Sequence, residues 1–150
     1  MNRLTVAKTS DWNENQISDF LTSANIPLRL ACIDKQGHPL VCSMWFCYLD
    51  GYLWCASHQK SHIVKLLQEN NRCGFEIGVN DQPYMGVRGQ GCVDLLSEKA
   101  SEILLNLVTR YEIDEDSGLA KWLLSRTEDE YAVRISITRI TSWDYSDRMS

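Results

Sequence analysis

The sequence lacks the features that would assign it to a membrane or to nucleic acid. No apolar run approaches the roughly 20 residues that a membrane helix needs. The N-terminal segment lacks the apolar core of a secretory signal. Cations are scattered along the chain and the net charge is −5, whereas a nucleic-acid binder needs a basic face. We therefore expect a cytoplasmic protein with no membrane partner and no nucleic-acid partner.

The sequence also lacks closely paired cysteines, although cysteine itself is abundant. No two of the six cysteines form a C-x-x-C pair, and most lie inside apolar, strand-like runs. Free cysteine behaves as a small hydrophobe in such positions. We therefore expect reduced core thiols and no disulfides. The six are Cys32, Cys42, Cys47, Cys55, Cys73 and Cys92.

Linkers, low-complexity tracts and internal repeats are also lacking, so we expect one domain over residues 1–150. Apolar periodicity and capping residues predict helices over residues 13–24, 61–69, 97–111 and 119–124. Strands are predicted over residues 28–33, 40–49, 52–56, 73–79 and 85–95, with a last strand from residue 131. The phase of the last strand slips at Arg139–Ile140, which predicts a bulge.

The order of these elements predicts the fold class. Consecutive strands joined by hairpins, such as the one at Asp50–Gly51, favour an antiparallel sheet over βαβ units. Six strands with apolar faces and few helices suit a small closed barrel, which leaves no exposed edges. We therefore expect a mainly β protein with flanking helices, built as a six-stranded antiparallel barrel.

The predicted strand over residues 40–49 is apolar almost throughout. The interior of one small barrel can take up side chains from only one of the two pleat directions, so the others need a second cover. We therefore expect a homodimer with this strand in the interface.

Several short motifs follow one another in a characteristic order between Pro27 and Leu96, a segment that covers about half of the chain. They are Leu30-Ala31-Cys32-Ile33-Asp34, Gly37-His38-Pro39, Met44-Trp45-Phe46, Asp50-Gly51, Trp54-Cys55-Ala56-Ser57, Ser61 opening a helix, Asn71-Arg72-Cys73-Gly74-Phe75-Glu76, and Pro83-Tyr84 through Gly91. In order and spacing this set resembles the pyridoxamine 5′-phosphate oxidase-like, FMN-binding split-barrel superfamily.

The resemblance implies a split β-barrel that forms homodimers and binds FMN between the two chains. It places the strand Val41–Phe46 beside the flavin ring, Ala56-Ser57 at the ribityl chain and phosphate, and the helix opening at Ser61 at the phosphate. The dipole and free N–H groups of a helix amino end favour anions for an independent physical reason. Cofactor-binding residues are therefore expected at Met44, Trp45, Phe46, Ala56, Ser57, Ser61, His62, Lys65, Arg88 and Gln90.

The chain departs from the family pattern at the phosphate. Family oxidases place Arg-Lys after the helix-opening serine, where this chain has His62-Ile63, and Phe46 stands where a further lysine often lies. Because charge-assisted contacts are the strong ones, we expect weaker phosphate binding. Lys60, His62, Lys65 or Arg88 are candidates to compensate. The substrate-phosphate residues of the true oxidase cannot be placed in this sequence, so pyridoxamine phosphate oxidation is not expected.

Several of these residues have a second interpretation. His62 is either a phosphate donor or a solvated side chain on a surface helix. The glycines around Arg88 and Gln90 mark either the close approach of a ligand or a bent barrel corner. Trp45 fits a flavin wall and a plain core position equally well, whereas Trp54 fits the core better.

Two possible metal sites are weak. Cys55, His58 and His62 have a C-x-x-H-x-x-x-H spacing, but strong zinc signatures carry a second close pair. The acidic run 114–116 offers carboxylates for a hard cation, yet a solvated loop explains it better. We expect no metal site.

Two functions remain open from the sequence. The first is a flavin-dependent oxidoreductase acting on a small molecule, in which the flavin performs the redox chemistry. The second is a non-catalytic split-barrel module that binds haem, a deazaflavin or another ligand, with His58 or His62 as an axial ligand. The missing Arg-Lys pair favours the second, and the aromatic, glycine-containing pocket favours the first. The sequence shows no clear acid, base or nucleophile, so catalytic residues stay unassigned.

Overall fold

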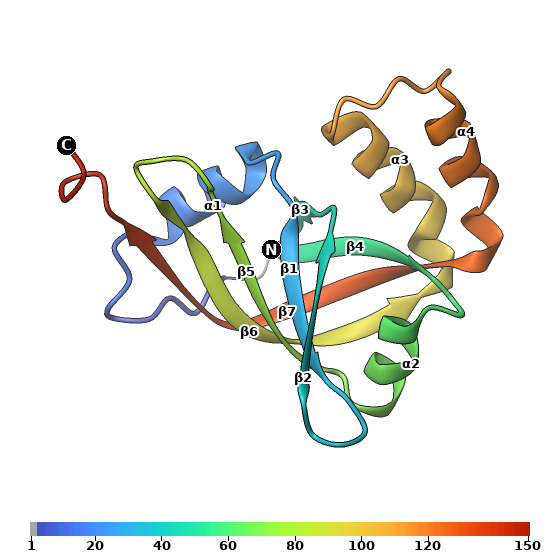
Figure 1. Ribbon diagram of the computed structural model, residues 1–150, viewed down its shortest axis with the longest axis horizontal. Helices are drawn as coiled ribbons and strands as arrows, with labels where there is room; N and C mark the ends of the chain where they lie inside the picture. The colour runs from blue at the N-terminus through green and yellow to red at the C-terminus, as the bar shows by residue number, and fades with distance from the viewer. Residues whose placement is uncertain (1–2) are drawn as a thin grey trace.

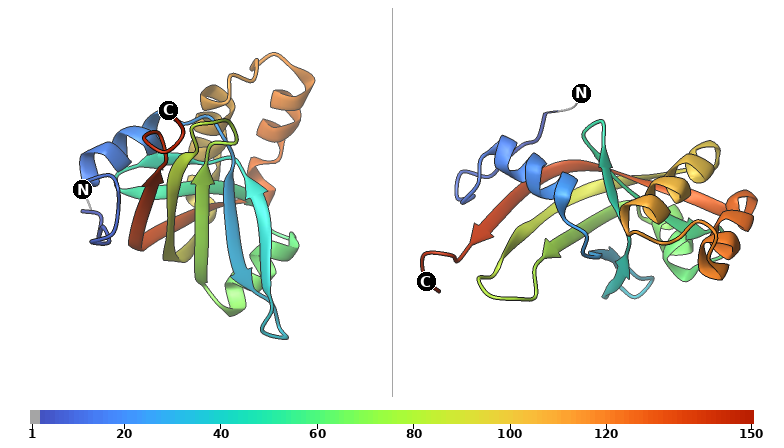
Figure 2. Two further views of the ribbon diagram at one scale, coloured as in Figure 1. Left: turned by 60° about the vertical axis from the view of Figure 1, so that its left-hand side comes forward. Right: turned by 90° about the horizontal axis from the view of Figure 1, so that it is seen from above.

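The computed structural model describes residues 3–150, which form an antiparallel sheet flanked by helices (Figures 1 and 2). The α-helices are α1 (Glu14–Ser23), α2 (His62–Glu69), α3 (Ala100–Arg110) and α4 (Gly118–Ser125), with 3-10 turns at Ser97–Lys99 and Thr127–Asp129. The strands are β1 (Leu28–Ile33), β2 (Pro39–Met44), β3 (Cys47–Leu49), β4 (Tyr52–His58), β5 (Arg72–Gly78), β6 (Met85–Leu96) and β7 (Glu130–Asp144).

Side-chain caps set the starts of the first two helices. The Asn13 side chain accepts from the Gln16 N–H, and the Gln16 side chain accepts from the Asn13 N–H, both at 2.9 Å. The Ser61 Oγ accepts from the Val64 N–H at 3.3 Å and so caps α2. Each cap satisfies amide donors that the first turn leaves without an intrahelical partner. The third helix begins at Ala100, after a 3-10 turn that starts at Ser97.

The strands lie in the order β2-β1-β5-β6-β7-β4-β3, and every neighbouring pair is antiparallel. The expectation of six strands in a closed barrel is therefore wrong in two respects. The sheet of the described chain has seven strands, and its two ends, β2 and β3, are not paired with each other. The sheet curls without closing, as the two views of Figure 2 show.

The predicted strand over residues 40–49 divides because it changes neighbours. In β2, Met44 pairs with Leu28 of β1, whereas in β3 Cys47 pairs with Trp54 of β4. At the break, the Phe46 N–H donates to the Tyr111 hydroxyl at 3.1 Å instead of joining a ladder. One apolar run therefore supplies both edges of the sheet.

The bulge predicted from the phase slip in the last strand is confirmed, one residue before Arg139. Gln90 pairs with Arg139 and Gly91 with Ile137, so Thr138 is the extra residue of β7. Its hydroxyl donates to the Gln90 carbonyl at 3.0 Å. Bulges bend a strand, and this one lies where the long β6–β7 pair curls around the core.

Hydrophobic side chains form two clusters on opposite faces of β4. Leu53 and Cys55 belong to the larger cluster, which fills the concave side of the sheet, and Trp54 belongs to a smaller one beneath α3. Successive strand residues point to opposite faces, so both faces of β4 are covered. Trp54 is 6% exposed and is a core residue, as expected. Within residues 3–150, no helix combines the length and apolar character that crossing a bilayer requires.

Candidate functional site

A cavity of about 420 Å³ lies where the sheet fails to close, and we call it the split pocket. Strands β2 and β4 supply one part of its lining, α3 supplies a second part, and α2, α4, β7 and the segment after β2 supply one residue each. The lining residues are Cys42, Ser43, Met44, Trp45, Ala56, Ser57, Ile63, Leu104, Leu107, Val108, Leu123 and Glu130. The volume lies within the range of about 300–1,000 Å³ that is usual for small-molecule sites.

The aromatic wall of the split pocket is fixed from behind by α3. The Trp45 ring stacks on the Tyr111 ring with centroids 5.1 Å apart and planes within 11° of parallel. The Tyr111 hydroxyl accepts from the Phe46 N–H and donates to the Ile26 carbonyl at 3.0 Å. Burial raises the pKa of this hydroxyl, so it stays protonated at neutral pH and can donate. The Tyr111 ring, which two hydrogen bonds anchor, therefore holds the Trp45 ring at the wall of the pocket.

The end of α3 is tied to the rest of the fold by Arg110. Its guanidinium donates to the carbonyls of Leu21 and Thr22, both at 2.7 Å, and of Ala24 at 2.5 Å. The same group lies 4.8 Å from the centroid of the Phe46 ring. Three carbonyls at the end of α1 thereby gain hydrogen-bond donors. The contact with Phe46 positions α3, which walls the pocket, against the break between β2 and β3.

The polar end of the split pocket lies where β4 meets α2. The Ser57 and Ser61 hydroxyls are 2.8 Å apart. Ile63 is 9% exposed and packs into the core while lining the pocket. His62 and Lys65 are both exposed on the first turns of α2. The site thus offers the Ser57 hydroxyl from the lining, with the Ser61 hydroxyl beside it and His62 and Lys65 on the solvent side.

Glu130 is a buried carboxyl group at the same end of the pocket. It is 4% exposed, and one carboxylate oxygen lies 3.2 Å from Arg126 Nη2. Burial raises its pKa, and the nearby charges of Arg126 and His58 partly offset that rise. In the ladder it pairs with His58, the last residue of β4. The sequence had given no sign of an acid in this site.

His58 has its ring orientation fixed by a local hydrogen bond. Its Nδ1 accepts from the Lys60 N–H at 3.0 Å. In the part of the chain that the structure describes, no three potential metal ligands are grouped together.

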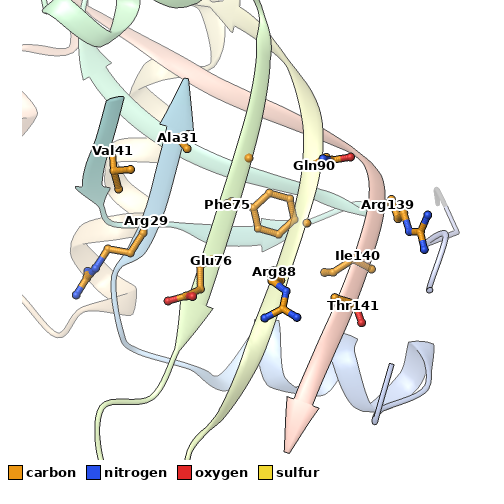
Figure 3. A pocket seen from close by; sticks show the side chains of 12 residues that line it. Arg29, Ala31, Val41, Phe75, Glu76, Arg88, Gln90, Arg139, Ile140 and Thr141 are labelled. Carbon is orange, nitrogen blue, oxygen red and sulfur yellow. The ribbon is translucent and has the colours of Figure 1, made fainter. Parts of the chain in front are cut away.

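A larger, open groove of about 810 Å³ lies on the convex face of the sheet, which we call the outer groove (Figure 3). Ladder pairing places Arg29 beside Glu76, Glu76 beside Arg88, and Arg88 beside Thr141, which forms a polar row across four strands. Gln90 lies in the next row, and its neighbour on β5 is Gly74, which adds no side chain. The floor of the outer groove is therefore flat, and it carries a row of polar side chains with arginines among them.

The structure places the predicted site residues in three locations. Met44, Trp45, Ala56 and Ser57 line the split pocket. Arg88 and Gln90 line the outer groove. Ser61, His62 and Lys65 lie on or beside the first turns of α2. Phe46 lines neither cavity: it is fully buried, and its ring contacts Arg110.

The glycines of β6 are explained by the packing of the protein itself. A Cβ on Gly89 would lie 2.6 Å from the Phe75 ring, and one on Gly91 would lie 2.9 Å from the Ile135 side chain. Neighbouring strands and core side chains thus take up the space beside these glycines. The close approach at these glycines is therefore that of the protein's own strands and core side chains.

The residues that the sequence analysis missed come from elements outside the resembling segment. Leu104, Leu107 and Val108 had been assigned to the apolar stripe of a helix, which is correct, but the stripe also walls the pocket. Glu130 is the last residue of the acidic run 128–130, a composition that is typical of an exposed segment. One signal was available in the sequence. Ala132 lies two residues after Glu130 on the same face of β7, and its small side chain leaves room beside β4.

Comparison with protein-family models finds no match for this sequence, and comparison with curated proteins finds none either. Solved structures do match. A conserved hypothetical protein from Mycobacterium tuberculosis is 23% identical, with a TM-score of 0.79 over 94% of this chain and 90% of that one. An F420 reductase is 20% identical, with a TM-score of 0.68 over 82% of this chain and 94% of its own.

A candidate pyridoxamine 5′-phosphate oxidase from Listeria innocua is 15% identical, with a TM-score of 0.66 over 88% of this chain and 97% of that one. This chain has the split-barrel fold of the pyridoxamine 5′-phosphate oxidase-like proteins. The fold that the resemblance implied is therefore confirmed, with the correction that the split barrel has seven strands. In this split barrel the split pocket lies between β2 and β4, at the split itself.

Proposed function

We propose that this split-barrel protein is a flavin-dependent oxidoreductase that binds FMN in the split pocket and acts on a small molecule. The observation that carries the proposal is the lining of that pocket. Met44 of β2, Trp45 directly after it, and Ala56 and Ser57 of β4, which the resemblance assigns to the flavin, face one cavity from the two sides of the split. The fold of an F420 reductase, a protein that is named for a deazaflavin, supports the same ligand class.

The lining fits a flat, largely apolar ring with a polar tail. Trp45 and Met44 offer an aromatic and a polarisable surface, and the leucines of α3 exclude water from the opposite side. Ser57 and Ser61 offer hydroxyls to the tail, with His62 and Lys65 nearby as cations. When bound, the flavin supplies the redox chemistry, and the chain supplies binding, orientation and a dry environment.

A homodimer is part of this proposal. Val41 on the edge strand β2 is 63% exposed, and the convex face beside it is the open outer groove. A second copy covering this face would bury Val41 and bring Arg88 and Gln90 toward a neighbouring split pocket, as the resemblance implies. The substrate would then meet the flavin between the two copies.

The lining of the split pocket gives the haem alternative less support than it gives flavin. Within the described chain, neither His58 nor His62 is among the residues that line this pocket. An axial ligand has to reach the iron of a haem. We therefore retain flavin as the proposed ligand.

Fluorescence titration of the purified protein with FMN tests the proposal. Trp45→Ala removes one face of the pocket and is expected to raise the FMN dissociation constant about ten-fold. Trp122→Ala, which removes an exposed tryptophan on α4, is the matched control and is expected to bind FMN as the wild type does. Equal FMN affinity in both variants, or no binding by the wild type, would contradict the proposal.

A further inference from the structure

The outer groove carries a row of charges that alternate in sign from strand to strand. Ladder pairing places Arg29 of β1, Glu76 of β5 and Arg88 of β6 side by side, and all three line the groove. Figure 3 shows the three charged groups apart from one another on this face. Within residues 3–150, none of the three forms an ion pair. The row therefore presents positive, negative and positive charges to whatever covers the sheet here.

This charged row reaches the edge strand, and a second, uncharged row runs beside it. Arg29 also pairs with Ser43 of β2, so the charged row begins with a hydroxyl. Two residues away along each strand, ladder pairing forms the row Val41, Ala31, Gly74 and Gln90. The small residues Ala31 and Gly74 lie at its centre. The boundary between β1 and β5 is therefore the middle of both rows.

A second copy of this chain can neutralise the charged row through a two-fold axis. An axis that lies between two facing sheets and runs parallel to the strands reverses the strand order in the second copy. If it passes between β1 and β5, Arg29 of each copy faces Glu76 of the other. The same axis sets Ala31 opposite Gly74, where small side chains let the two sheets approach closely. Both rows are therefore self-complementary about this axis.

Other two-fold axes match these rows less well. An axis between β5 and β6 pairs Glu76 with Arg88, but it leaves Arg29 opposite Thr141 and places nothing of β6 over Val41. An axis that runs along the charged row faces each charge with its own copy, and like charges across an interface repel. The axis between β1 and β5 instead sets Val41, which is 63% exposed, opposite β6 of the second copy.

We propose that two copies of this chain dock through their outer grooves about a two-fold axis between β1 and β5, held by reciprocal Arg29–Glu76 ion pairs. Complementary charges fix the register of an interface and disfavour wrong arrangements. The inference rests on the homodimer of the proposed function and gives that homodimer a specific geometry.

This geometry makes the second copy contribute to the split pocket. Ser43 lines that pocket and stands in the charged row beside Arg29. About the proposed axis, β2 faces β6 of the second copy, so Arg88 of the second copy stands opposite Ser43. The lining that the described chain itself supplies includes no lysine, arginine or histidine. The second copy thereby brings a guanidinium to the mouth of a pocket that has no cation in its own lining.

Sedimentation velocity of charge-reversal variants, at tens of micromolar protein, tests this geometry. Glu76→Arg and Arg29→Glu each replace two attractive contacts across the axis by two repulsive ones. Each variant alone is expected to raise the dimer dissociation constant by about 100-fold or more and to sediment as a monomer. An equimolar mixture of the two variants restores both attractive contacts, so it is expected to sediment as a heterodimer.

Two control variants separate this pairing from a general effect of charge. Arg88→Glu reverses a charge of the same row that the axis sets opposite Ser43, and it is expected to stay dimeric. Glu115→Arg reverses an exposed charge between α3 and α4 and is also expected to stay dimeric. The mixture guards against a folding defect, because misfolded chains would not recover a dimer when mixed.

Three results overturn the inference. The first is a Glu76→Arg or Arg29→Glu variant that dimerises as the wild type does, and the second is a mixture that stays monomeric. The third is a monomeric Arg88→Glu, which would place the axis between β5 and β6. A monomeric wild type has a different meaning, because it contradicts the proposed homodimer itself. Sedimentation needs no flavin, so none of these results depends on FMN binding, which titration measures separately.

Discussion

At the scale of single residues, Ser61 performs two tasks at one place. Its Oγ caps α2 through the Val64 N–H and also contacts the Ser57 hydroxyl at the polar end of the split pocket. The cap contributes to stability, and the contact with Ser57 places the hydroxyl at the proposed flavin site. Two substitutions separate these tasks because they differ in charge and in capping ability.

Ser61→Ala should lower the free energy of unfolding by about 1 kcal/mol, since alanine is a poor N-cap. Ser61→Asp should keep the stability of the wild type, since aspartate caps well, but it adds a carboxylate near the proposed phosphate position. FMN binding should therefore fall more in Ser61→Asp than in Ser61→Ala, while stability follows the opposite order. Urea unfolding and FMN titration of both variants measure the two orders. If binding and stability fell together, the tail would not lie at α2.

The buried carboxyl of Glu130 should make stability depend on pH. Its pKa is raised above the ordinary value of 4.5 by burial, so the folded protein holds this proton more tightly than the unfolded chain. The contribution of Glu130 to the free energy of unfolding therefore falls as the pH rises from 4.5 through the raised pKa. Glu130→Gln lacks this titration, so its stability relative to the wild type should improve with rising pH.

Urea unfolding of the two proteins across this pH window measures the difference, and Glu128→Gln is the control because its carboxyl is exposed. A stability difference between wild type and Glu130→Gln that stays constant with pH would show that the buried carboxyl does not titrate in this window.

At the scale of elements, the carboxyl end of α3 connects the helices to the pocket. Tyr111, just past the helix, bonds to the backbone of Phe46 and Ile26 and stacks on Trp45. The break between β2 and β3 therefore depends on a residue far away in sequence. This contact explains why Trp45 can wall a cavity although its own segment lies outside any ladder.

Tyr111→Phe should keep the stacking and lose both hydrogen bonds. Leaving two partly buried backbone groups without this partner should cost about 1–3 kcal/mol in the free energy of unfolding. The FMN dissociation constant should rise several-fold, because Trp45 is less firmly held. Tyr84→Phe, at an exposed loop position, is the control and should change neither quantity. Normal stability in Tyr111→Phe would show that water replaces the hydroxyl without cost.

Much of the secondary structure was predictable because local patterns are strong. The first helix was predicted over residues 13–24 and lies at Glu14–Ser23, and the first strand was predicted at its observed bounds. The break at Trp45–Phe46 was not predictable, because hydrophobicity is continuous through it and only the choice of neighbouring strand divides it. The prediction of a closed barrel was wrong for the same reason, because hydrophobicity does not say which strands become neighbours.

The candidate site was predictable in its β2 and β4 part only. Met44, Trp45, Ala56 and Ser57 lie within the segment that carries the resemblance, and they share one cavity. The wall from α3 and the acid of β7 join the site through tertiary contacts that periodicity does not encode. Glu130 follows two exposed acids, so its burial is invisible until β7 is paired with β4.

At the scale of the whole molecule, the surfaces of the sheet that no helix covers lie on one side. The edge strand β2, the exposed Val41 and the outer groove are continuous across β1, β5 and β6. An exposed sheet edge is open to pairing or to cover by another chain. The proposed homodimer would use this surface and leave α4 outside it.

Val41→Asp should therefore convert the dimer to a monomer, because it replaces an apolar side chain that the proposed interface would bury with a charged one. Sedimentation at tens of micromolar protein measures the change. Leu119→Asp, which replaces an exposed apolar residue on α4, is the control and should stay dimeric. A wild type that sediments as a compact monomer would refute the homodimer.

The absorption spectrum of the freshly purified protein, before and after incubation with FMN and removal of excess ligand, tests the central claim most directly. The central claim is that the split pocket holds a flavin. The account predicts the two absorption bands of an oxidised flavin in the protein fraction, and it predicts that Trp45→Ala loses most of that absorbance. A haem Soret band, or a protein that stays colourless after incubation with FMN, would contradict it.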